Sequence, residues 1–337
     1  MINRVGKQTI QFDSMPVISG FASAVGKKEG EGPLKDYFDE INYDTRLGQD
    51  SWEKAECLLQ QHTASLALHN SGKKSDDIGF VFAGDLLNQC ISSSYSMRDY
   101  NIPYLGQYGA CSTMAQNIIM SSVMIESGAT DASLCVTSSH FCTAERQYRY
   151  PLEYGGQRPQ TAQWTVTGSG SCVVEKNNGQ NMPKIKLATV GKIIDLGVKD
   201  ANNMGAAMAP AACETLKAFF EDTNTNADNY DLILTGDLGK TGTALLYDLM
   251  GNYGYSIDKI HRDCGLLIYD IQSQDTHSGG SGCGCCASVF CSYILKSMLK
   301  GDYKNILFMA TGALMSPTSN QQGESIPSIA HLVNIIM

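Results

Sequence analysis

The chain has 337 residues, of which 43% are hydrophobic and 18% charged, so it can bury a large core, and this excludes an intrinsically disordered or low-complexity scaffold. It carries 25 Lys and Arg against 34 Asp and Glu, a formal net charge of -9. Because no segment is dense enough in basic residues to follow a phosphate backbone, nucleic acid is not expected as a partner.

The beginning of the chain, residues 1–15, alternates polar and apolar side chains and lacks the basic and apolar regions of a secretory signal. The longest apolar stretches, around 118–125 and 332–337, fall far short of the ~18 residues that a membrane span needs. We therefore expect an intracellular protein that lies beside a membrane if it works with one. Its 12 cysteines are expected to be small buried thiols and not a disulfide framework.

An internal duplication organises the chain. Gly84-Asp85-Leu86 closes one apolar strand, and Gly236-Asp237-Leu238 closes another 152 residues later. At the same offset, the helical pattern of 51–70 falls on 203–222. Each half therefore predicts a helix, a short polar loop, a strand and the same turn.

A second offset, of 173 residues, relates the glycine-rich turns and the helices that follow them. Gly109-Ala110-Cys111-Ser112 falls on Gly282-Cys283-Gly284-Cys285, and the strand predicted at 132–137 falls on that at 305–311. Both helices begin with tiny residues, so we expect them to pack together between two sheets. Strands separated by helices imply sheets covered on both faces. The prediction is an α/β fold of duplicated βαβ halves in a five-layer α-β-α-β-α sandwich.

We place the boundary between the halves near residue 180, giving halves of 1–180 and 181–337. The first half contains an insertion at about 141–167 that has no counterpart of similar character in the second half. This insertion is rich in Arg and Tyr and has little apolar periodicity. Long irregular segments of compact domains are often functional, and an ordered insertion without a function of its own is the alternative.

The duplication, the cysteine at the head of the first central helix and the glycine-rich head of the second together resemble the thiolase-like superfamily of ketoacyl synthases and thiolases. More closely, the chain resembles the stage V sporulation protein AD family of spore-forming bacteria. The blocks that carry this closer resemblance span nearly the whole chain: Ala83–Gln89, Gly109–Thr113, Thr137–His140, Thr143–Pro151, Thr167–Gly170, Met208–Ala212, Leu234–Leu238, Gly279–Cys283 and Ala310–Leu314. The resemblance implies a thiolase fold.

The same resemblance implies a role in sporulation. Proteins of this family are expected to bind dipicolinic acid, which accumulates in the spore core as its calcium chelate, and to assist its uptake into the developing spore. The expected partners are membrane proteins of the same sporulation system, and the expected location is peripheral to the spore inner membrane. Because many relatives in the superfamily dimerise through the N-terminal half, a homodimer is a further expectation.

Cys111 matches the position of the acyl-accepting cysteine of the superfamily, and a helix N-terminus lowers the pKa of a thiol. The partner groups differ, because Asp237 stands where many condensing enzymes have His or Asn, and an ionised Asp would raise the pKa of Cys111. His277 precedes a glycine loop similar to that of thiolases but without its proline. We expect a degenerate, non-catalytic site in which Cys111 and His277 are vestiges. The alternative is a thiolase-like or ketoacyl-synthase-like acyltransferase with Cys111 as nucleophile.

No cofactor or metal is expected. Cys283 and Cys286 form a Cys-x-x-Cys pair, but a structural zinc site needs a second pair or a Cys/His set at ligand spacing. The glycine string at 168–170 matches neither a phosphate-binding loop nor a dinucleotide fingerprint.

Dipicolinate carries two carboxylates on a pyridine ring, so its pocket should offer Arg or Lys donors, backbone amides and flat apolar walls. The segment 140–158 supplies such donors among several tyrosines, and if calcium dipicolinate is the ligand, a carboxylate can complete the shell of the ion. The alternative for this segment is a subunit interface or a solvated loop. The candidate ligand-binding residues are Cys111, His140, Arg146, Arg149, Arg158 and Asp237.

Overall fold

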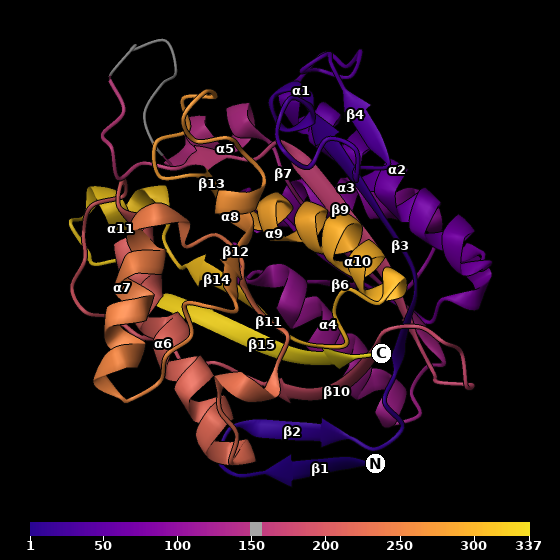
Figure 1. Cartoon of the computed structure of the whole chain (residues 1–337). Helices are drawn as coiled ribbons and strands as arrows, with labels where there is room; N and C mark the ends of the chain where they lie inside the picture. The colour runs from indigo at the N-terminus through magenta and orange to yellow at the C-terminus, as the bar shows by residue number, and fades with distance from the viewer. Residues whose placement is uncertain (149–156) are drawn as a thin grey trace.

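The computed structural model describes residues 1–148 and 157–337 (Figure 1). Within these residues, one continuous 13-stranded sheet contains two runs of five strands in the same order, which we call the first and the second sheet. The order is β6-β5-β7-β9-β3 in the first and β12-β11-β14-β15-β10 in the second. In each sheet the first three strands are parallel, and the fourth runs antiparallel to both of its neighbours. The strands are β3 (Val17–Gly26), β5 (Phe80–Gly84), β6 (Tyr104–Gly106), β7 (Ala132–Ser139) and β9 (Gly168–Glu175), then β10 (Lys184–Thr189), β11 (Leu232–Thr235), β12 (His261–Asp263), β14 (Asn305–Ala313) and β15 (Ser328–Ile336).

This repetition confirms the predicted duplication. The helices α2 (Trp52–Ser71) and α6 (Met204–Thr223) have 20 residues each and begin 152 residues apart. The strands β7 and β14 begin 173 residues apart, as predicted, whereas β6 and β12 begin 157 apart. The second half therefore gains five residues before β12, in the stretch that holds α7 (Gly239–Asn252), and sixteen after it, in the stretch that holds α8 (Cys264–Leu267) and β13 (Gly280–Ser281).

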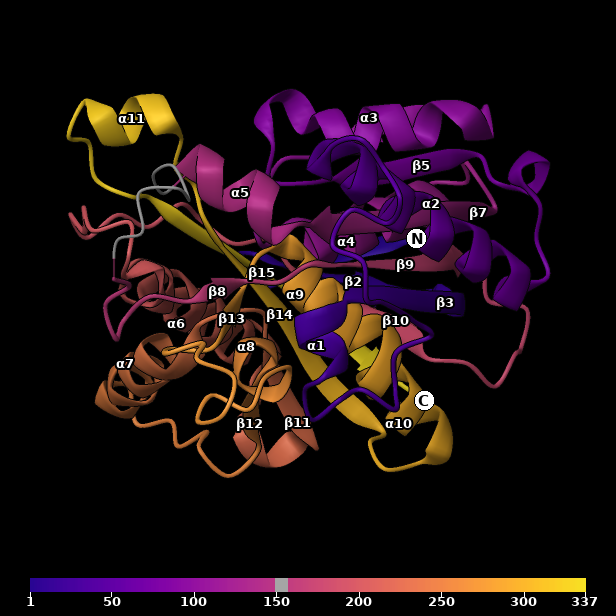
Figure 2. The same cartoon turned by 90° about the horizontal axis from the view of Figure 1, so that it is seen from above.

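Helices cover both faces of each sheet and give five layers in the described part of the chain (Figures 1 and 2). On the outside, α2 and α3 (Ile91–Met97) pack on the first sheet, and α6 packs on the second with α7 against it. Between the sheets lie α4 (Thr113–Glu126) and a second helix, in which α9 (Cys283–Val289) continues through a π turn (Phe290–Ile294) into α10 (Leu295–Lys300). The ring of Phe290 stacks on that of Phe308 in β14, with centroids 4.3 Å apart.

The small residues at the head of α9 are required by close contact with β9. A Cβ atom added to Gly284 would lie 2.3 Å from the carbonyl oxygen of Gly168, and one added to Gly170 would lie 2.3 Å from that of Ala287. Every residue of α9 is buried, which is expected of a helix enclosed on all sides. The predicted central helices are therefore confirmed, together with the reason for their small residues.

The two sheets meet at a single paired position, where Val17 of β3 faces Lys184 of β10. The hairpin of β1 (Ile2–Val5) and β2 (Thr9–Phe12) then extends the second sheet by pairing with β10. In Figure 1 this hairpin lies at the lower edge of the molecule, beside the second half. The first residues of the chain thus pack with the C-terminal half.

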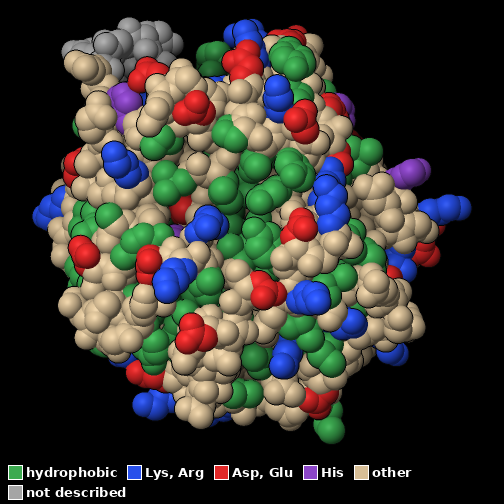
Figure 3. Space-filling model, viewed as in Figure 1, with side chains coloured by type: hydrophobic (Ala, Val, Ile, Leu, Met, Phe, Trp, Pro, Cys, Tyr) green, Lys and Arg blue, Asp and Glu red, His purple; other side chains and the backbone are tan. Residues whose placement is uncertain are grey.

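Short elements complete the fold. They are α1 (Lys27–Gly30), β4 (Glu40–Asn42), α5 (Phe141–Tyr148), β8 (Trp164–Thr165) and α11 (Pro317–Gln321), with single 3-10 turns at Ser75–Asp77, Asn88–Cys90, Arg98–Tyr100 and Ala227–Asn229. The predicted insertion at 141–167 thus holds α5 and β8, and β8 pairs with β13. Charged side chains of both signs are spread over the face in Figure 3, with hydrophobic ones gathered at its centre over α9. None of the helices in residues 1–148 and 157–337 combines the length and apolarity needed to cross a bilayer.

Candidate functional site

A cavity of about 40 Å³ lies at the head of α4, where the two halves meet. This volume holds a few water molecules. Its walls are mostly apolar, and among the described residues its lining includes no Lys or Arg. The lining residues are Leu86, Tyr108, Ala110, Cys111, Ala144, Glu145, Tyr148, Thr165, Met204, Ser281, Ala313 and Met315.

Cys111 lies in this lining, two residues before the first residue of α4, and is only 5% exposed. The turn that presents it is tight, because the preceding residue, Ala110, has a φ of 48° in the left-handed region. The carboxyl group of Asp237 and the backbone N–H of Gly282 lie near enough to the Cys111 thiol to act on its pKa. The sequence therefore located the thiol correctly relative to the helix, and the structure adds its partners.

Asp237 follows β11 and is completely buried. Its Oδ2 accepts hydrogen bonds from Ser281 Oγ (3.1 Å) and from the backbone N–H of Gly282 (2.9 Å), and its Oδ1 accepts one from Thr311 Oγ1 (2.8 Å). Gly282 has a φ of 107°, which a residue with a side chain rarely adopts, so the turn that aims its N–H at Asp237 depends on glycine. Burial raises the pKa of Asp237, while these donors oppose the shift.

These contacts determine the state of the thiol. Burial, followed by the charge of Asp237, raises the pKa of Cys111 well above its usual value. The position near a helix N-terminus had predicted the opposite direction, but that effect is worth only about 0.3–1 kcal/mol at an ordinary site and does not offset a buried carboxylate beside the sulfur. Cys111 is therefore a protonated thiol at neutral pH and a poor nucleophile.

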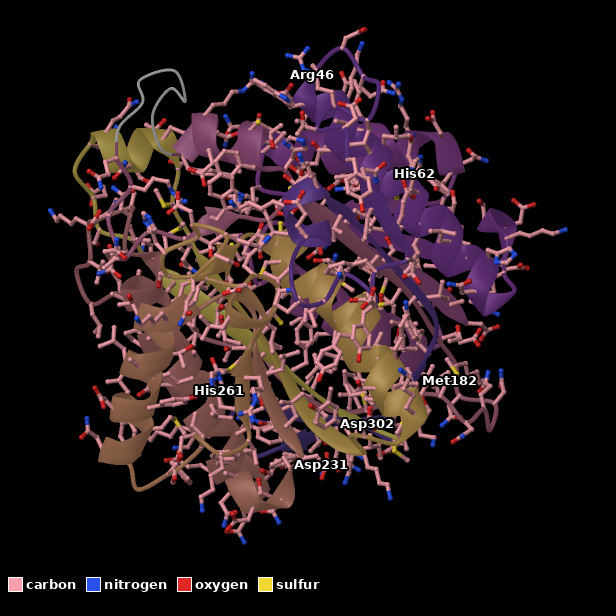
Figure 4. All side chains as sticks on the ribbon, turned by 45° about the horizontal axis from the view of Figure 1, so that its top comes forward. Arg46, His62, Met182, Asp231, His261 and Asp302 are labelled. Atoms are coloured by element: carbon pink, nitrogen blue, oxygen red, sulfur yellow. The ribbon has the colours of Figure 1, made fainter. Side chains whose placement is uncertain are left out.

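No His is among the described residues that line the Cys111 cavity. His277 lies near the surface, where its Nδ1 donates to the carbonyl of Pro159 (2.9 Å) and its Nε2 faces the carboxylate of Asp275 (3.0 Å). His261 is buried in the second half of the chain. Figure 4 shows it low in the view, whereas Arg46 is labelled at the top. Its ring nitrogens face the hydroxyls of Thr235 (2.9 Å) and Tyr247 (3.0 Å), and burial lowers its pKa to about 3.

Three other predicted ligand-binding residues, His140, Arg146 and Arg158, do not gather around Cys111. Arg146 pairs with Glu53, and its guanidinium lies over the ring of Trp52. Arg158 donates to the carbonyl of Gln163 and lies over the ring of Trp164. His140, Arg146 and Arg158 are absent from the described lining of the Cys111 cavity. Arg149 lies outside the described residues.

His140 instead closes a loop. Its Nε2–H donates to the carbonyl of Thr45 (2.8 Å), and its Nδ1 accepts the N–H of Cys142 (3.2 Å). Both ring nitrogens are thus used in a neutral imidazole, and burial lowers the pKa of this group. His140 therefore holds the loop at Thr45 against the start of α5.

The side chains of α5 close the cavity from above. The hydroxyl of Tyr148 donates to the carbonyl of Leu86 and lies 3.0 Å from the hydroxyl of Tyr108. Glu145, from the same helix, accepts a hydrogen bond from Thr165 Oγ1 (2.9 Å). In residues 1–148 and 157–337, no group of three or more His, Cys, Asp or Glu side chains is arranged to hold a metal ion.

Comparison with known proteins shows which family the chain belongs to. The sequence model of stage V sporulation protein AD matches residues 6–336. The chain belongs to the stage V sporulation protein AD family. It is 46% identical to the stage V sporulation protein AD of Bacillus subtilis (strain 168) over 326 residues, which cover 97% of this chain and 96% of that protein.

Solved structures of Xanthomonas campestris OleA share the fold. A variant of OleA superposes with a TM-score of 0.66 at 13% identity, covering 97% of this chain and 98% of the other. OleA bound to cerulenin gives 0.63 at 12% identity, with 97% and 98% covered. At this identity the likeness shows the fold alone. It confirms the predicted thiolase fold of this stage V sporulation protein AD family member.

Sequence reasoning missed several residues that build the site of this family member. The hydroxyls of Ser281 and Thr311 bond to Asp237, and Tyr108 and Tyr148 close the cavity. The Gly279–Cys283 and Ala310–Leu314 blocks did contain the first two. What the sequence lacked was any signal that Ser281 of β13 and Thr311 of β14 meet at Asp237.

Proposed function

We propose that this member of the stage V sporulation protein AD family binds dipicolinic acid in the Cys111 cavity without catalysis and assists its uptake into the developing spore. The observation that carries the proposal is the contact between Cys111 and Asp237. A thiolase-like fold keeps a cavity at the position of its nucleophile, while a buried carboxylate keeps the thiol protonated. The cavity is then suited to holding a ligand and poorly suited to forming an acyl thioester.

We propose calcium dipicolinate as the form that this cavity takes. Glu145 belongs to the lining and Asp237 lies directly behind Cys111, whereas no Lys or Arg is among the described lining residues. A free dianion there would face carboxylates across a short distance in a poorly solvated site. The calcium chelate carries no net charge, and carboxylate and hydroxyl oxygens are ligands that calcium accepts.

Ligand entry requires the cavity to open. A pyridine ring with two carboxylates is larger than the few water molecules that about 40 Å³ can hold. The contacts of Tyr148 with Leu86 and Tyr108 are the hydrogen bonds that close the cavity on the α5 side. We therefore propose that Tyr148 moves away from these partners when ligand binds.

Isothermal titration calorimetry tests the proposal, with dipicolinate added in the presence and in the absence of calcium. Ala313 lines the cavity and is 5% exposed, so Ala313→Leu fills the space that the ligand needs. Ala129→Leu adds the same atoms at an exposed position and is the matched control. We expect binding heat with calcium in the wild type and in Ala129→Leu, and its loss in Ala313→Leu. If no heat beyond that of dilution is measured at millimolar ligand, with or without calcium, the proposed binding is wrong.

The partners are part of the same proposal. We propose that the protein acts with membrane proteins of the same sporulation system, peripheral to the spore inner membrane. Co-purification from sporulating cells checks this, and recovery of the protein without any membrane protein contradicts it. This adaptor role and ligand binding are compatible, and a structural adaptor alone predicts co-purification without binding heat.

A homodimer through the first half is also proposed. The edge strand β6 has a single strand partner, β5, and its Tyr104 and Leu105 are 36% and 40% exposed. Exposed edge strands are prone to pair with another chain. Leu105→Lys should lower the mass measured by light scattering to that of a monomer, whereas Leu299→Lys, at an exposed position on α10, should not. A wild type that is already monomeric at high concentration would remove this proposal.

Acyl transfer is the second candidate, because Cys111 does reach the cavity. It predicts that incubation with an acyl-CoA or acyl-carrier thioester adds an acyl group to Cys111. Intact-mass spectrometry detects such an adduct, and Cys111→Ser is the control. The raised pKa of Cys111 leads us to expect no adduct at neutral pH.

A further inference from the structure

A second cavity lies on the other side of the wall that closes the Cys111 cavity. Its volume is about 290 Å³, and its lining includes Lys27, Lys28, Thr45, Phe141 and Trp164. We call it the Lys28 cleft. Thr165 lines the Cys111 cavity and the adjacent Trp164 lines the cleft, because successive residues of β8 point to opposite faces.

Helix α5 divides the two cavities in the same way. Phe141 and Cys142 at its start line the cleft, while Ala144 and Tyr148 line the Cys111 cavity. The two cavities therefore lie on opposite sides of one wall, and the side chains that line the larger cavity differ in charge from those of the smaller.

The cleft combines a flat aromatic wall with positive charge. The rings of Phe141 and Trp164 stack with centroids 4.0 Å apart and an interplanar angle of 17°. The ammonium of Lys28 lies 4.1 Å from the centroid of Trp164, and the guanidinium of Arg158 lies 5.0 Å from it. Flat aromatic walls flanked by Lys and Arg are suited to a planar ring that carries carboxylates.

Lys28 is the charge in this cleft that a ligand can neutralise. No carboxylate among the described residues lies within ion-pair distance of its ammonium, although Lys28 is nearly half-buried. Burial lowers the pKa of this group, whereas the charges of Asp275 and Glu29 act against that shift. Asp275 itself pairs with His277 at 3.0 Å. An incoming carboxylate would offset that desolvation.

The acidic side chains around the cleft are already engaged. Glu29 is buried, where it accepts hydrogen bonds from the hydroxyl of Tyr269 and the N–H of Thr167. Glu31 pairs with Lys27 at 4.0 Å. Asp44 accepts the backbone N–H groups of its own loop, at 3.0 Å and 2.7 Å.

We propose that the Lys28 cleft is a second binding site, which takes a planar aromatic carboxylate as the free anion, with the ring against the Phe141–Trp164 stack and a carboxylate on Lys28. The site is independent of the Cys111 cavity and of the function proposed for that cavity. The two sites differ in charge, because Lys27 and Lys28 line the cleft beside its carboxylates, whereas the described lining of the Cys111 cavity includes no Lys or Arg.

Trp164 supplies a direct probe of the cleft. The chain has 2 Trp, so Trp52→Phe leaves Trp164 as its single tryptophan. Titration of this variant with dipicolinate and excess EDTA, corrected with free N-acetyltryptophanamide, should quench Trp164 fluorescence with saturation. cis-Cyclohexane-1,3-dicarboxylate, which carries two carboxylates on a saturated ring without a basic nitrogen, should bind about tenfold more weakly.

Two further variants make the test specific. Lys28→Met in the Trp52→Phe background keeps the length of the stem and should weaken binding about tenfold or more. Lys35→Met, at an exposed position outside the cleft lining, should leave it unchanged. If Trp52→Phe fails to fold, Trp164→Phe in the native chain should instead abolish the saturable quenching.

The outcomes separate this proposal from the function proposed above. Saturable quenching that depends on Lys28 and persists in Ala313→Leu supports the cleft as an independent site. Quenching that is absent, insensitive to Lys28→Met, or equal for the saturated analogue overturns it. Calorimetric heat that disappears in Ala313→Leu supports the Cys111 cavity whichever result the fluorescence gives.

Discussion

A buried carboxyl group, Glu56 in α2, yields a quantitative prediction of pH dependence. Its oxygens lie 2.9 Å from Ser138 Oγ and 2.8 Å from Thr143 Oγ1. Thr143 Oγ1 also lies 2.9 Å from the carbonyl oxygen of His140. Since a hydroxyl has one hydrogen, Thr143 can donate to that carbonyl only while it accepts from a protonated Glu56. Burial, and next the charge of Asp85, raise the pKa of Glu56 to about 8, so this proton is present at pH 7.

The magnitude follows from the proton count. In the unfolded chain Glu56 titrates near 4.5, and in the folded protein near 8. Because the pKa is raised by folding, the stability from this group is complete below pH 4.5 and is lost as the pH rises through 8. Within that window the folded state holds one proton more than the unfolded state. The free energy of unfolding therefore falls by about 1.4 kcal/mol for each unit by which the pH rises.

The perturbation is Glu56→Gln, which keeps the shape of the side chain, donates an N–H to Thr143 and does not titrate. Urea unfolding at pH 5.5, 6.5 and 7.5 gives the free energies of unfolding. The wild type should lose stability over this range more steeply than the variant, by about 1.4 kcal/mol per pH unit. Glu221→Gln is the control, because the Glu221 side chain is 58% exposed, and it should follow the wild type. Parallel curves for the wild type and Glu56→Gln would refute the reasoning.

Three further predictions concern the core and the site. Gly284→Ala places a Cβ 2.3 Å from a backbone carbonyl of β9 and should destabilise the fold by about 2 kcal/mol or more in thermal unfolding, whereas Gly251→Ala, with open space around its Cβ, should stabilise it by up to about 1 kcal/mol. Asp237→Asn removes the charge beside Cys111, so alkylation of Cys111 at pH 8, followed by peptide mass spectrometry, should accelerate, and an unchanged rate would show that Asp237 does not control the thiol. Burial lowers the pKa of His261 to about 3, so the free energy of unfolding should fall as the pH drops from 6.5 towards 3. Urea unfolding of His261→Gln should show a smaller fall over this range, and an equal fall in the wild type and the variant would contradict the prediction.

The fold was predictable because its information is repeated in the sequence. Two constant offsets fixed the order of elements in both halves, and the tiny residues of Gly282–Cys285 indicated a helix under close contact. The structure has elements at both offsets, 152 residues for α2 and α6 and 173 for β7 and β14, and it places Gly284 against a carbonyl of β9. Periodicity and residue size are local properties of a sequence, so they can be recognised without knowing which residues a segment contacts in the fold.

The candidate site was only partly predictable, because side-chain direction in an irregular segment depends on contacts far away in the chain. Arg146 turns to Glu53 and Trp52, which belong to α2. Arg158 turns to Trp164, and His140 turns to the loop at Thr45. Composition predicted Arg and Tyr side chains around a ligand, whereas the cations and rings that line the Lys28 cleft include Lys27, Lys28, Phe141 and Trp164. It could not predict that Cys111 would lie on the opposite side of the same wall.

The repeated Gly-Asp-Leu turn shows how one duplicated motif acquired two roles. In the first half, Asp85 folds back on its own turn and accepts the N–H groups of Leu87 and Ser93, both at 2.8 Å. In the second half, Asp263 at the end of β12 does this work instead, accepting the N–H groups that follow Asp237 at 2.8 Å and 3.0 Å. Because the start of α7 is already held by Asp263, the carboxyl group of Asp237 is free to accept from Ser281 and Thr311 and to lie near Cys111. The duplicated fold therefore has one such site, and its position follows from where the second half differs from the first.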